Sequence, residues 1–394
     1  TESTENTYTG RPTNMMSLAK GTTSTSFSTK YRLRMYVDES YNPQGDGGNL
    51  AFSIKINAYG KTGDKIPEPT AAEVLAAKAN AEDLDYNSAT DAQKKEMWTF
   101  SHEATEQTTA LTDYRYIGAN PNNYIKFNDE LWRIIGVFDT DDGTGKVEKR
   151  LKIIRNESIG SYSWDNKDTT TGAENNYGKN EWAEARLNYL LNLGHESETA
   201  GGSLYWNRGA GNCYKGYQNA TKTCDFTTTG LTEKAKAMIV TAKWYLGGTE
   251  RYNSSSNGLA SHWYKYERGT KVYSGRGTSW TGKVGLMYLS DYGYATSGGA
   301  TTNRASCLAK ELTKWDDSSV SDCKDNDWMY NSSKSQWTIT PKFNTNGVFY
   351  VDNTGYVNSN IVYGDCGVRP VVHLNSAIKV ITGSGTKESP YILE

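Results

Sequence analysis

The chain has 394 residues and an almost balanced charge, with 43 Lys and Arg against 45 Asp and Glu. Its length allows two or three domains of ordinary size, and the charge balance argues against a protein that binds nucleic acid or a membrane surface through basic residues. The composition includes 28 Tyr, 11 Trp and 38 Gly but only 8 Phe. Such a mixture is typical of β-rich extracellular proteins, because amphipathic aromatic side chains pack on one side and form hydrogen bonds on the other.

The location of the protein is indicated by what the chain contains and lacks. No apolar run of 18 residues occurs, so we expect no insertion into a membrane. The first residue is Thr rather than Met, which indicates a processed chain or a fragment, and a cleaved leader would fit a secreted product. We therefore expect an extracellular or cell-surface protein.

The five cysteines form two close pairs and a single residue. Cys213 lies near Cys224, Cys307 lies near Cys323, and Cys366 stands alone. Neither pair has the spacing of a zinc site or a redox motif, so we expect two disulfides, which persist outside the reducing cytosol. Cys366 is expected to be a buried thiol rather than a nucleophile.

The first 61 residues are expected to form a β-rich module. Residues 1–30 are polar and lack periodicity, as in an extended arm. Residues 31–38 and 50–60 alternate apolar and polar side chains on either side of a Gly-rich turn, which predicts a hairpin. A lone hairpin is marginal in water, so it must borrow strands from the arm, from the rest of the chain or from a neighbouring molecule.

Residues 62–112 are expected to form a helical connector. Thr70 can cap an Ala-rich helix that follows it, and Ser88 or Thr90 can cap a second short one.

Residues 113–394 predict one domain with mixed elements, and the whole chain is assigned to the α+β class. Antiparallel strands are expected at 123–127 and 131–138, joined by a turn at Asn128 and Asp129. A strand is expected from 147 and a helix over 180–192. A second helix is expected to be capped by Thr232 and ended by Gly247 and Gly248. After it we expect a strand and loop over 282–295, a short helix at 303–312 and a closing series of strands from Trp337 to Leu393.

No catalytic, metal or cofactor motif is found. The acidic run 139–146 resembles a calcium loop, but Arg150 occupies the twelfth position where such a loop needs Glu, so a tight hairpin is the better interpretation. Asp165 and Asp168 could hold a cation, which leaves calcium as an open alternative. The four histidines are scattered singly, and we expect no enzyme, although paired carboxylates that meet in space are invisible in a sequence.

The segment 337–363 mixes aromatic residues with Asn, Ser and Thr. This mixture is typical of adaptable binding surfaces, in which aromatic side chains supply area and small polar ones supply hydrogen bonds. Plain hairpins with cross-strand aromatic pairs are the alternative. Arg369, in an otherwise apolar strand, is interpreted as a structural clamp on backbone carbonyls rather than a ligand contact.

Several strings in residues 114–394 support a resemblance, among them "YIGANPNNYIKFNDELWRIIGVF", "WTGKVGLMYLSDYGYATSGG" and "GVRPVVHLN". They resemble surface proteins of gut Firmicutes, and the region resembles the C-type-lectin-like fold of the formylglycine-generating type. The resemblance implies a ligand-facing surface and a scaffold behind it. The surface would include Trp337, Tyr350, Tyr356, Asn358, Asn360 and Tyr363, and the scaffold would include Gly367, Arg369 and Pro370.

The sequence departs from that family in two ways. It lacks the E-P-N or Q-P-D triplets of calcium-dependent sugar-binding lectins, and only Cys366 is left without a partner, so the paired active-site cysteines of the enzymes are absent. The N-terminal hairpin resembles, more weakly, camelysin-type fibre proteins and pilin-like N-termini, which implies that residues 1–30 donate a strand to a neighbouring subunit.

These observations predict a bacterial adhesin or pilus-like filament subunit that displays a lectin-like domain to a glycan or protein ligand, with roles in adhesion or biofilm. Two alternatives stay open at this point. One is a purely structural filament protein, and the other is a glycan-acting enzyme on the same scaffold, which would need carboxylates clustered in a cleft.

Overall fold

The structure, a computed structural model, describes residues 68–166, 177–248 and 258–394. The arm and hairpin expected at 1–61 lie outside the described residues, as does Asp168. Residues Pro69–Glu394 form one compact unit. The segment 69–112 therefore belongs to the same body as the rest, where the sequence predicted a separate connector ending at 112.

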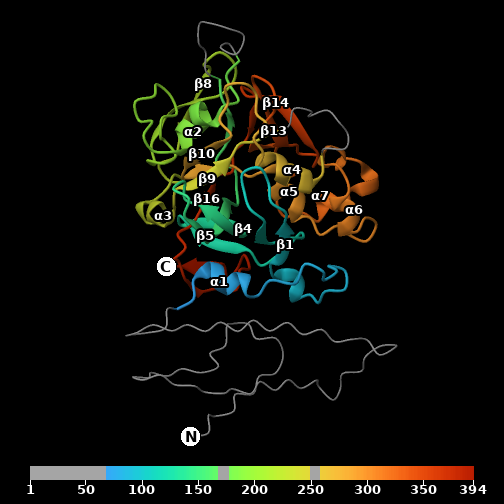
Figure 1. The fold of residues 1–394 in the computed structure, drawn as a ribbon. Coiled ribbons are helices and arrows are strands. Elements are labelled where there is room, and N and C mark those ends of the chain that lie inside the picture. The colour runs from blue at the N-terminus through green and yellow to red at the C-terminus, as the bar shows by residue number, and fades with distance from the viewer. Residues whose placement is uncertain (1–67, 167–176, 249–257) are drawn as a thin grey trace, which may run out of the picture. The chain divides into compact units, whose positions relative to one another are not determined.

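The described residues contain a 9-stranded sheet, called here the large sheet, which is mostly antiparallel (Figure 1). Its strands in spatial order are β11 (Val284–Gly285), β16 (Val371–His373), β5 (Val147–Arg155), β4 (Glu130–Asp141), β3 (Tyr124–Phe127), β18 (Tyr391–Leu393) and β17 (Val380–Thr382), with β2 (Leu111–Arg115) on β4 and β1 (Trp98–His102) on β2. The hairpin β3–β4 confirms the predicted strand pair. Asn128 and Asp129 have φ values of 57° and 61°, as a two-residue hairpin turn requires.

A second, 5-stranded sheet and two hairpins complete the β structure. The second sheet has the order β14 (Val357–Ile361), β13 (Gly347–Val351), β12 (Gln336–Pro341), β15 (Asp365–Gly367) and β6 (Ser161–Ser163). The hairpins are β7 (Ala210–Tyr214) with β8 (Thr221–Asp225), and β9 (Ala242–Tyr245) with β10 (Ser279–Gly282). The strands predicted after Trp337 are confirmed.

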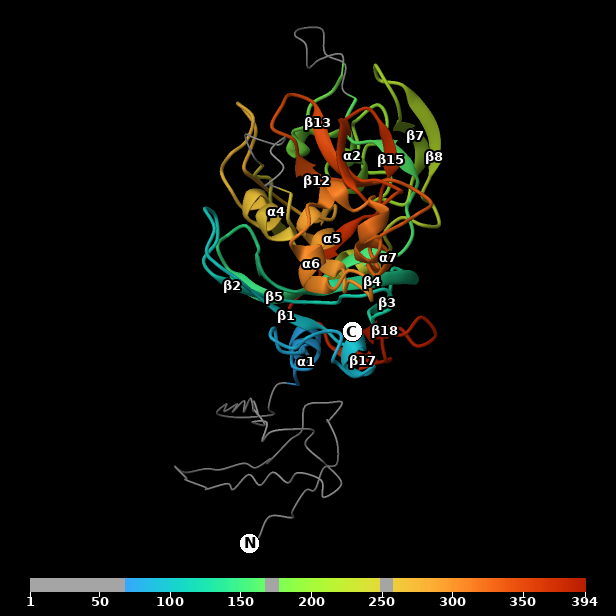
Figure 2. The same cartoon turned by 90° about the vertical axis from the view of Figure 1, so that its right-hand side faces the viewer.

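The helices are short. They are α1 (Ala71–Ala76), α2 (Arg186–Leu191), α3 (Glu233–Met238), α4 (Ala260–Glu267), α5 (Leu289–Ala295), α6 (Arg304–Leu308) and α7 (Asp322–Asp325), with 3₁₀ turns η1 (Gln93–Lys95), η2 (Trp182–Glu184), η4 (Leu312–Lys314) and η5 (Ser318–Val320). Helix α1 lies on one side of the large sheet, and α4–α7 lie on the other side, towards the second sheet (Figure 2). The α+β class is confirmed.

Helix α1 begins where the sequence placed its cap. The Thr70 hydroxyl accepts from the Glu73 N–H, and the Glu73 carboxylate accepts from the Thr70 N–H at 2.9 Å. This reciprocal capping box fixes the first turn. The Ala71 N–H donates to the Ile378 carbonyl, which ties the helix to the C-terminal part of the chain.

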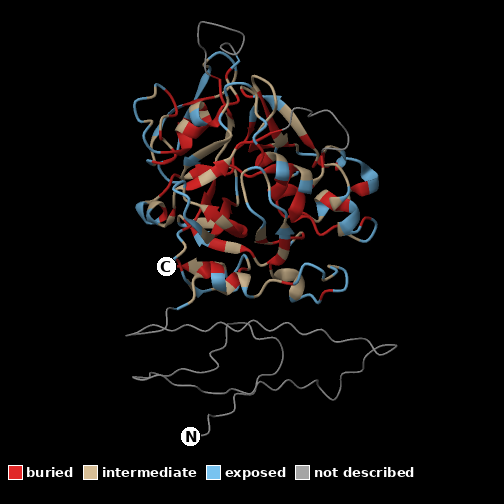
Figure 3. Ribbon diagram, in the orientation of Figure 1, coloured by how far each residue is buried: buried red, intermediate tan, exposed pale blue. Residues whose placement is uncertain are grey.

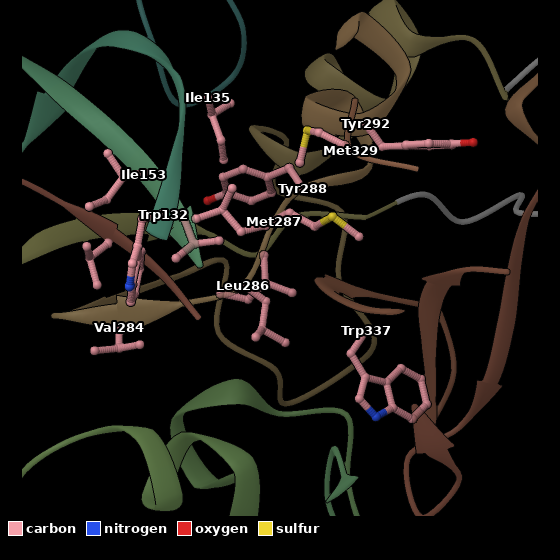
Figure 4. Packing of buried hydrophobic residues seen from close by; sticks show 14 of the residues in the cluster. Trp132, Ile135, Ile153, Val284, Leu286, Met287, Tyr288, Tyr292, Met329 and Trp337 are labelled. Carbon is pink, nitrogen blue, oxygen red and sulfur yellow. The ribbon is translucent and has the colours of Figure 1, made fainter. Parts of the chain in front are cut away.

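The buried residues gather between the layers (Figure 3). Trp132 of β4 and Ile153 of β5 meet Val284, Leu286 and Met287 in one continuous core (Figure 4). The core thus joins both sheets, so the second sheet and its surface loops stand on a rigid base.

Three predicted elements differ in the structure. The helix capped by Thr232 ends at Met238 rather than at Gly247. The β-branched residues Ile239, Val240 and Thr241 follow it and favour extended backbone, and the Val240 N–H donates to the His373 carbonyl of β16.

The loop predicted within 282–295 is instead helix α5. Asp291 accepts from the Tyr288 N–H at 2.9 Å and so caps the helix. Every residue of α5 is buried, so the helix lacks the amphipathic pattern by which it could have been recognised.

The helix predicted over 180–192 is also divided, into η2 and α2, because Ala185 has extended backbone.

Candidate functional site

Trp337 does not reach the surface. It is 1% exposed, belongs to the core (Figure 4), and its indole N–H donates to the Tyr162 carbonyl at 2.9 Å. The Tyr350 ring covers it edge-on, with ring centroids 6.1 Å apart. Trp337 thus supports the surface rather than forming it, contrary to the expectation for a ligand contact.

Three other expected residues share one face of the hairpin β13–β14. Tyr350 is paired with Asn358, and Asn360 is two residues further along β14. Side chains alternate between the faces of a strand, so these three point the same way. Tyr356 joins them, because its hydroxyl accepts from the Asn358 side chain at 3.0 Å. All are partly or fully exposed.

Tyr363 lies in a different cluster, at the end of the second sheet. Its ring is stacked on Tyr177, with centroids 6.1 Å apart, and meets the edge of Tyr217 at 5.1 Å. The Tyr177 and Tyr217 rings are 5.5 Å apart. We call Tyr177, Tyr217 and Tyr363 the tyrosine platform.

The platform is held by hydrogen bonds among three distant segments. The Ser163 hydroxyl donates to the Tyr363 carbonyl and accepts from the Gly216 N–H at 2.7 Å. The Asn166 side chain donates to the Gly216 and Ala220 carbonyls on the turn that carries Tyr217. The 163–166 segment therefore fixes both the β7–β8 turn and the end of β14.

Tyr177, the remaining member of the platform, is placed by Asp165. Its buried carboxylate accepts from the Lys179 N–H at 2.7 Å and from the Arg186 N–H at 3.2 Å. Asp165 thereby positions the chain just after Tyr177. It was a cation candidate in the sequence, but its two oxygens are occupied by backbone donors.

Part of the platform is exposed. Tyr177 and Tyr217 are 38% and 39% exposed, and Ile361, two residues before Tyr363, is 36% exposed. These are three of the six large apolar or aromatic side chains that are exposed among the described residues. Clustering of this kind marks interaction sites on soluble proteins.

The chemistry of the platform combines flat rings with hydrogen-bonding groups. Desolvation and the neighbouring Tyr177 phenol raise the pKa of Tyr217. The ion pair between Lys215 and Asp365, at 3.6 Å, lies on the same turns. Aromatic faces can stack on sugar rings or apolar side chains, while hydroxyls and charges fix orientation.

Sequence reasoning found Tyr363 but missed Tyr177 and Tyr217. The nearest signal was the string "CYKGYQNATKTC", in which a tyrosine stands at the tip of a loop that two cysteines close. Exposed loop tips on rigid supports commonly carry binding residues.

Gly367 ends strand β15 of the second sheet, and Arg369 and Pro370 follow it in the chain. The buried Arg369 donates to the Arg155 carbonyl at 2.8 Å and to the Gln336 side chain at 3.1 Å. The Gly367 N–H donates to the Ser335 carbonyl, and the Pro370 carbonyl accepts from the Arg155 N–H. These contacts are those of a clamp that joins β5 to β12.

Both predicted disulfides are confirmed. Cys213 is bonded to Cys224 across the hairpin β7–β8, and Cys307 is bonded to Cys323. Cys366 is a buried free thiol, as predicted. Burial, with smaller contributions from Asp365 and Asp352, raises the pKa of the Cys366 thiol to about 12, so it is not poised as a nucleophile.

The acidic run 139–146 forms the predicted hairpin turn between β4 and β5. The Asp141 carboxylate accepts from the N–H groups of Gly143 and Gly145, and the Asp142 carboxylate accepts from the Thr144 N–H. Across residues 68–166, 177–248 and 258–394, no group of three or more His, Cys, Asp and Glu side chains is placed to hold a metal ion.

A buried ionic cluster lies in the core on the large sheet. We define it as Asp113, Arg115, Lys152 and Asp291. Arg115 bonds Asp113 at 2.7 Å and Asp291 at 3.0 Å, and Lys152 bonds the other oxygen of Asp291. All four side chains are 1–2% exposed. Although burial opposes ionisation, the cations Lys152 and Arg115 hold the pKa of Asp291 below its ordinary value.

Glu267 lies beside this cluster. Its carboxylate accepts from the Ser290 N–H at 3.0 Å and from the Ser290 hydroxyl. Burial raises the pKa of Glu267 to about 7, although Arg268 opposes the shift. Carboxylates with divergent pKa values are a feature of active sites, but Glu267 and Asp291 are 0% and 2% exposed, so no substrate reaches them. We therefore interpret these groups as part of the core.

Comparison with protein-family models, with curated proteins and with solved structures finds no match. The described part of the chain also has no helix that is long and apolar enough to cross a membrane. The functional argument therefore rests on the geometry of the chain itself.

Proposed function

We propose that the protein is an extracellular or cell-surface adhesin that binds a glycan or a protein ligand through the tyrosine platform and the neighbouring face of β13–β14. The observation that carries this proposal is the gathering of Tyr177, Tyr217 and Tyr363 on one exposed support. The segments that carry the three rings are held by hydrogen bonds to their backbone. They therefore lose little conformational freedom on binding, as in a preorganised contact surface.

The two disulfides support an extracellular setting, because such bonds persist outside the reducing cytosol. The hairpin that carries Tyr217 is closed by one of them. The support of the platform would accordingly weaken in a reducing compartment.

The test is a binding screen against printed glycans, immobilised mucin and extracellular-matrix proteins. The wild-type chain should bind at least one class of probe, and Tyr217→Ala should lower that affinity by about tenfold. Ile381→Ala is the matched control, since Ile381 is 55% exposed in β17 of the large sheet. The proposal would be overturned if Tyr217→Ala and Ile381→Ala lowered the affinity equally, or if the wild-type chain bound no probe.

The sequence adds a proposal for assembly. Residues 1–30 would donate a strand to a neighbouring subunit and so form a filament, and many copies of a weak site on one fibre would bind by avidity. Electron microscopy of the chain with and without residues 1–30 tests this. Filaments that disappear on deletion support it, and single particles from both chains contradict it.

Filaments that form but bind no probe would favour the purely structural alternative. The aromatic surface would then be a contact between subunits. In that case Tyr217→Ala should weaken the filament instead of ligand binding.

A further inference from the structure

A cavity of about 250 Å³ lies beside β1, and no residue of the tyrosine platform lines it. Trp98 and Phe100 of β1, Tyr294 of α5 and Arg304 of α6 form part of its lining. Glu82 and Ser261, both exposed, also line it. The volume is slightly below the range of roughly 300–1,000 Å³ that is usual for sites of drug-sized ligands.

The apolar lining consists of aromatic rings. Trp98, Phe100 and Tyr294 are 4–7% exposed and belong to a small separate core cluster. The Phe100 and Tyr294 rings are 5.3 Å apart and tilted. Fixed rings of this kind offer flat apolar faces to a ring-shaped ligand.

Arg304 brings a positive charge without an anion. Its Nε donates to the Thr296 carbonyl at 3.1 Å and its Nη2 to the Tyr294 carbonyl at 3.4 Å, and its guanidinium lies 4.9 Å from the centre of the Phe100 ring. Among the described residues, no carboxylate forms an ion pair with it.

The environment of Arg304 disfavours an uncompensated charge. Burial lowers its pKa to about 10, although Tyr294, Glu82 and Tyr86 oppose the shift. Glu82 does not neutralise it by contact, since the Glu82 carboxylate accepts from the Ser101 N–H at 3.0 Å. A carboxylate that entered the cavity would form a charge-assisted bond in a setting that strengthens it.

A second donor has no partner. The indole N–H of Trp98 is buried and makes no hydrogen bond, although buried polar groups are normally satisfied. A ligand oxygen would satisfy it. The cavity therefore combines flat apolar walls, the Arg304 cation, the unsatisfied Trp98 N–H, the exposed Glu82 carboxylate and His102.

We propose that this cavity binds a small organic carboxylate of about the size of a monosaccharide, with its ring against Trp98 and Phe100 and its carboxylate on Arg304. Sugar acids and aromatic acids share this chemistry. The site is separate from the adhesive surface and its occupancy does not depend on the proposed function.

The experiment follows the Trp98 indole N–H by two-dimensional nitrogen–proton NMR of the full chain, with the signal assigned from Trp98→Phe. Sodium D-glucuronate and sodium benzoate are titrated, with D-glucose and benzyl alcohol as the neutral counterparts. We expect the signal to shift saturably with at least one carboxylate and not with its counterpart. The two carboxylates distinguish a sugar acid from an aromatic acid.

Three variants assign the contacts. Arg304→Gln should weaken binding by about tenfold or more, because it removes the charge. Ser261→Trp should block the cavity from an exposed position on α4, and Glu82→Gln should strengthen binding by removing a like charge. If Arg304→Gln does not fold, the other two variants decide the question.

The proposal is overturned if neither carboxylate moves the Trp98 signal, or if the neutral counterpart binds as tightly. It is also overturned if a folded Arg304→Gln, or Ser261→Trp, binds like the wild type. Binding to the glycan and protein panel is a separate readout, so failure of this site leaves the adhesive proposal standing.

Discussion

The tyrosine platform and the buried ionic cluster use polar aromatic residues in opposite ways. In the core, the Tyr288 ring lies 4.4 Å from the Lys152 ammonium, so an aromatic face helps to shield a charge from water. On the platform, Tyr177 and Tyr217 leave more than a third of their surface exposed. The same residue type is therefore buried beside charges in one region and exposed in the other, where we propose that it contacts a ligand.

A high content of tyrosine does not by itself indicate the function of a protein. The role of each tyrosine depends on its position in the fold. Rings between packed layers close the core, whereas rings at the ends of strands and on hairpin turns remain free to bind. Changes in the core should accordingly alter stability, and changes on the platform should alter binding.

Removal of one core charge should have the largest effect. Asp291→Asn is expected to lower the free energy of unfolding by about 3–5 kcal/mol, because it leaves the buried Lys152 and Arg115 short of a partner. Urea unfolding followed by circular dichroism measures this. The control is Glu103→Gln, which breaks an exposed pair with Lys265 and should change stability little. Equal effects in the two variants would contradict the distinction between buried and exposed pairs.

The next effect is on pH dependence. The folded-state pKa of Glu267, about 7, lies above its ordinary value of 4.5. Between these values the folded chain holds a proton that the unfolded chain has lost, so the Glu267 contribution to stability falls as pH rises. The loss should be about 3 kcal/mol.

Glu267→Gln provides the comparison, because the amide keeps a neutral group near Ser290 without a titratable proton. The free energy of unfolding, measured by urea from pH 4 to pH 8, should fall more steeply with rising pH for the wild type than for this variant. If the free energy of unfolding depends on pH equally in the two chains, Glu267 does not titrate as described.

Removal of the disulfide that closes the hairpin carrying Tyr217 should cause a smaller loss of stability. The bond Cys213–Cys224 spans 11 residues, and replacing both cysteines by Ser should lower stability by about 2–3 kcal/mol. It should also weaken binding, since Tyr217 lies on the turn that this bond constrains. Cys366→Ala is the control, because it removes a buried thiol outside the hairpin. Binding that is unchanged in the double variant would contradict the role of the hairpin as support.

The sequence predicted elements whose signals are local. The turn at Asn128 and Asp129, the cap at Thr70 and the two disulfides each depend on neighbouring residues or on simple spacing. Helix α5 was missed because its burial is set by the tertiary structure, whereas strand β9 lies within the segment that was predicted as a helix. In α5 every face is covered, so no periodic pattern could mark it.

The sites were harder to predict because they join distant parts of the chain. Tyr177, Tyr217 and Tyr363 come from three distant segments of the chain, and hydrogen bonds from residues 163–166 join the segments that carry Tyr217 and Tyr363. Asp113, Lys152 and Asp291 come from β2, β5 and α5, and only the folded chain brings them into one buried cluster. Long-range contacts of this kind leave no mark on a single sequence.

The most direct test of the account is to measure affinity and stability together for Tyr177→Ala/Tyr217→Ala/Tyr363→Ala. The probe is the best one from the glycan, mucin and matrix-protein screen, and the method is surface plasmon resonance beside urea unfolding. We expect affinity to fall by more than about tenfold, with a stability change far below that of Asp291→Asn. Full affinity in the folded triple variant would contradict the claim that the tyrosine platform is the binding surface.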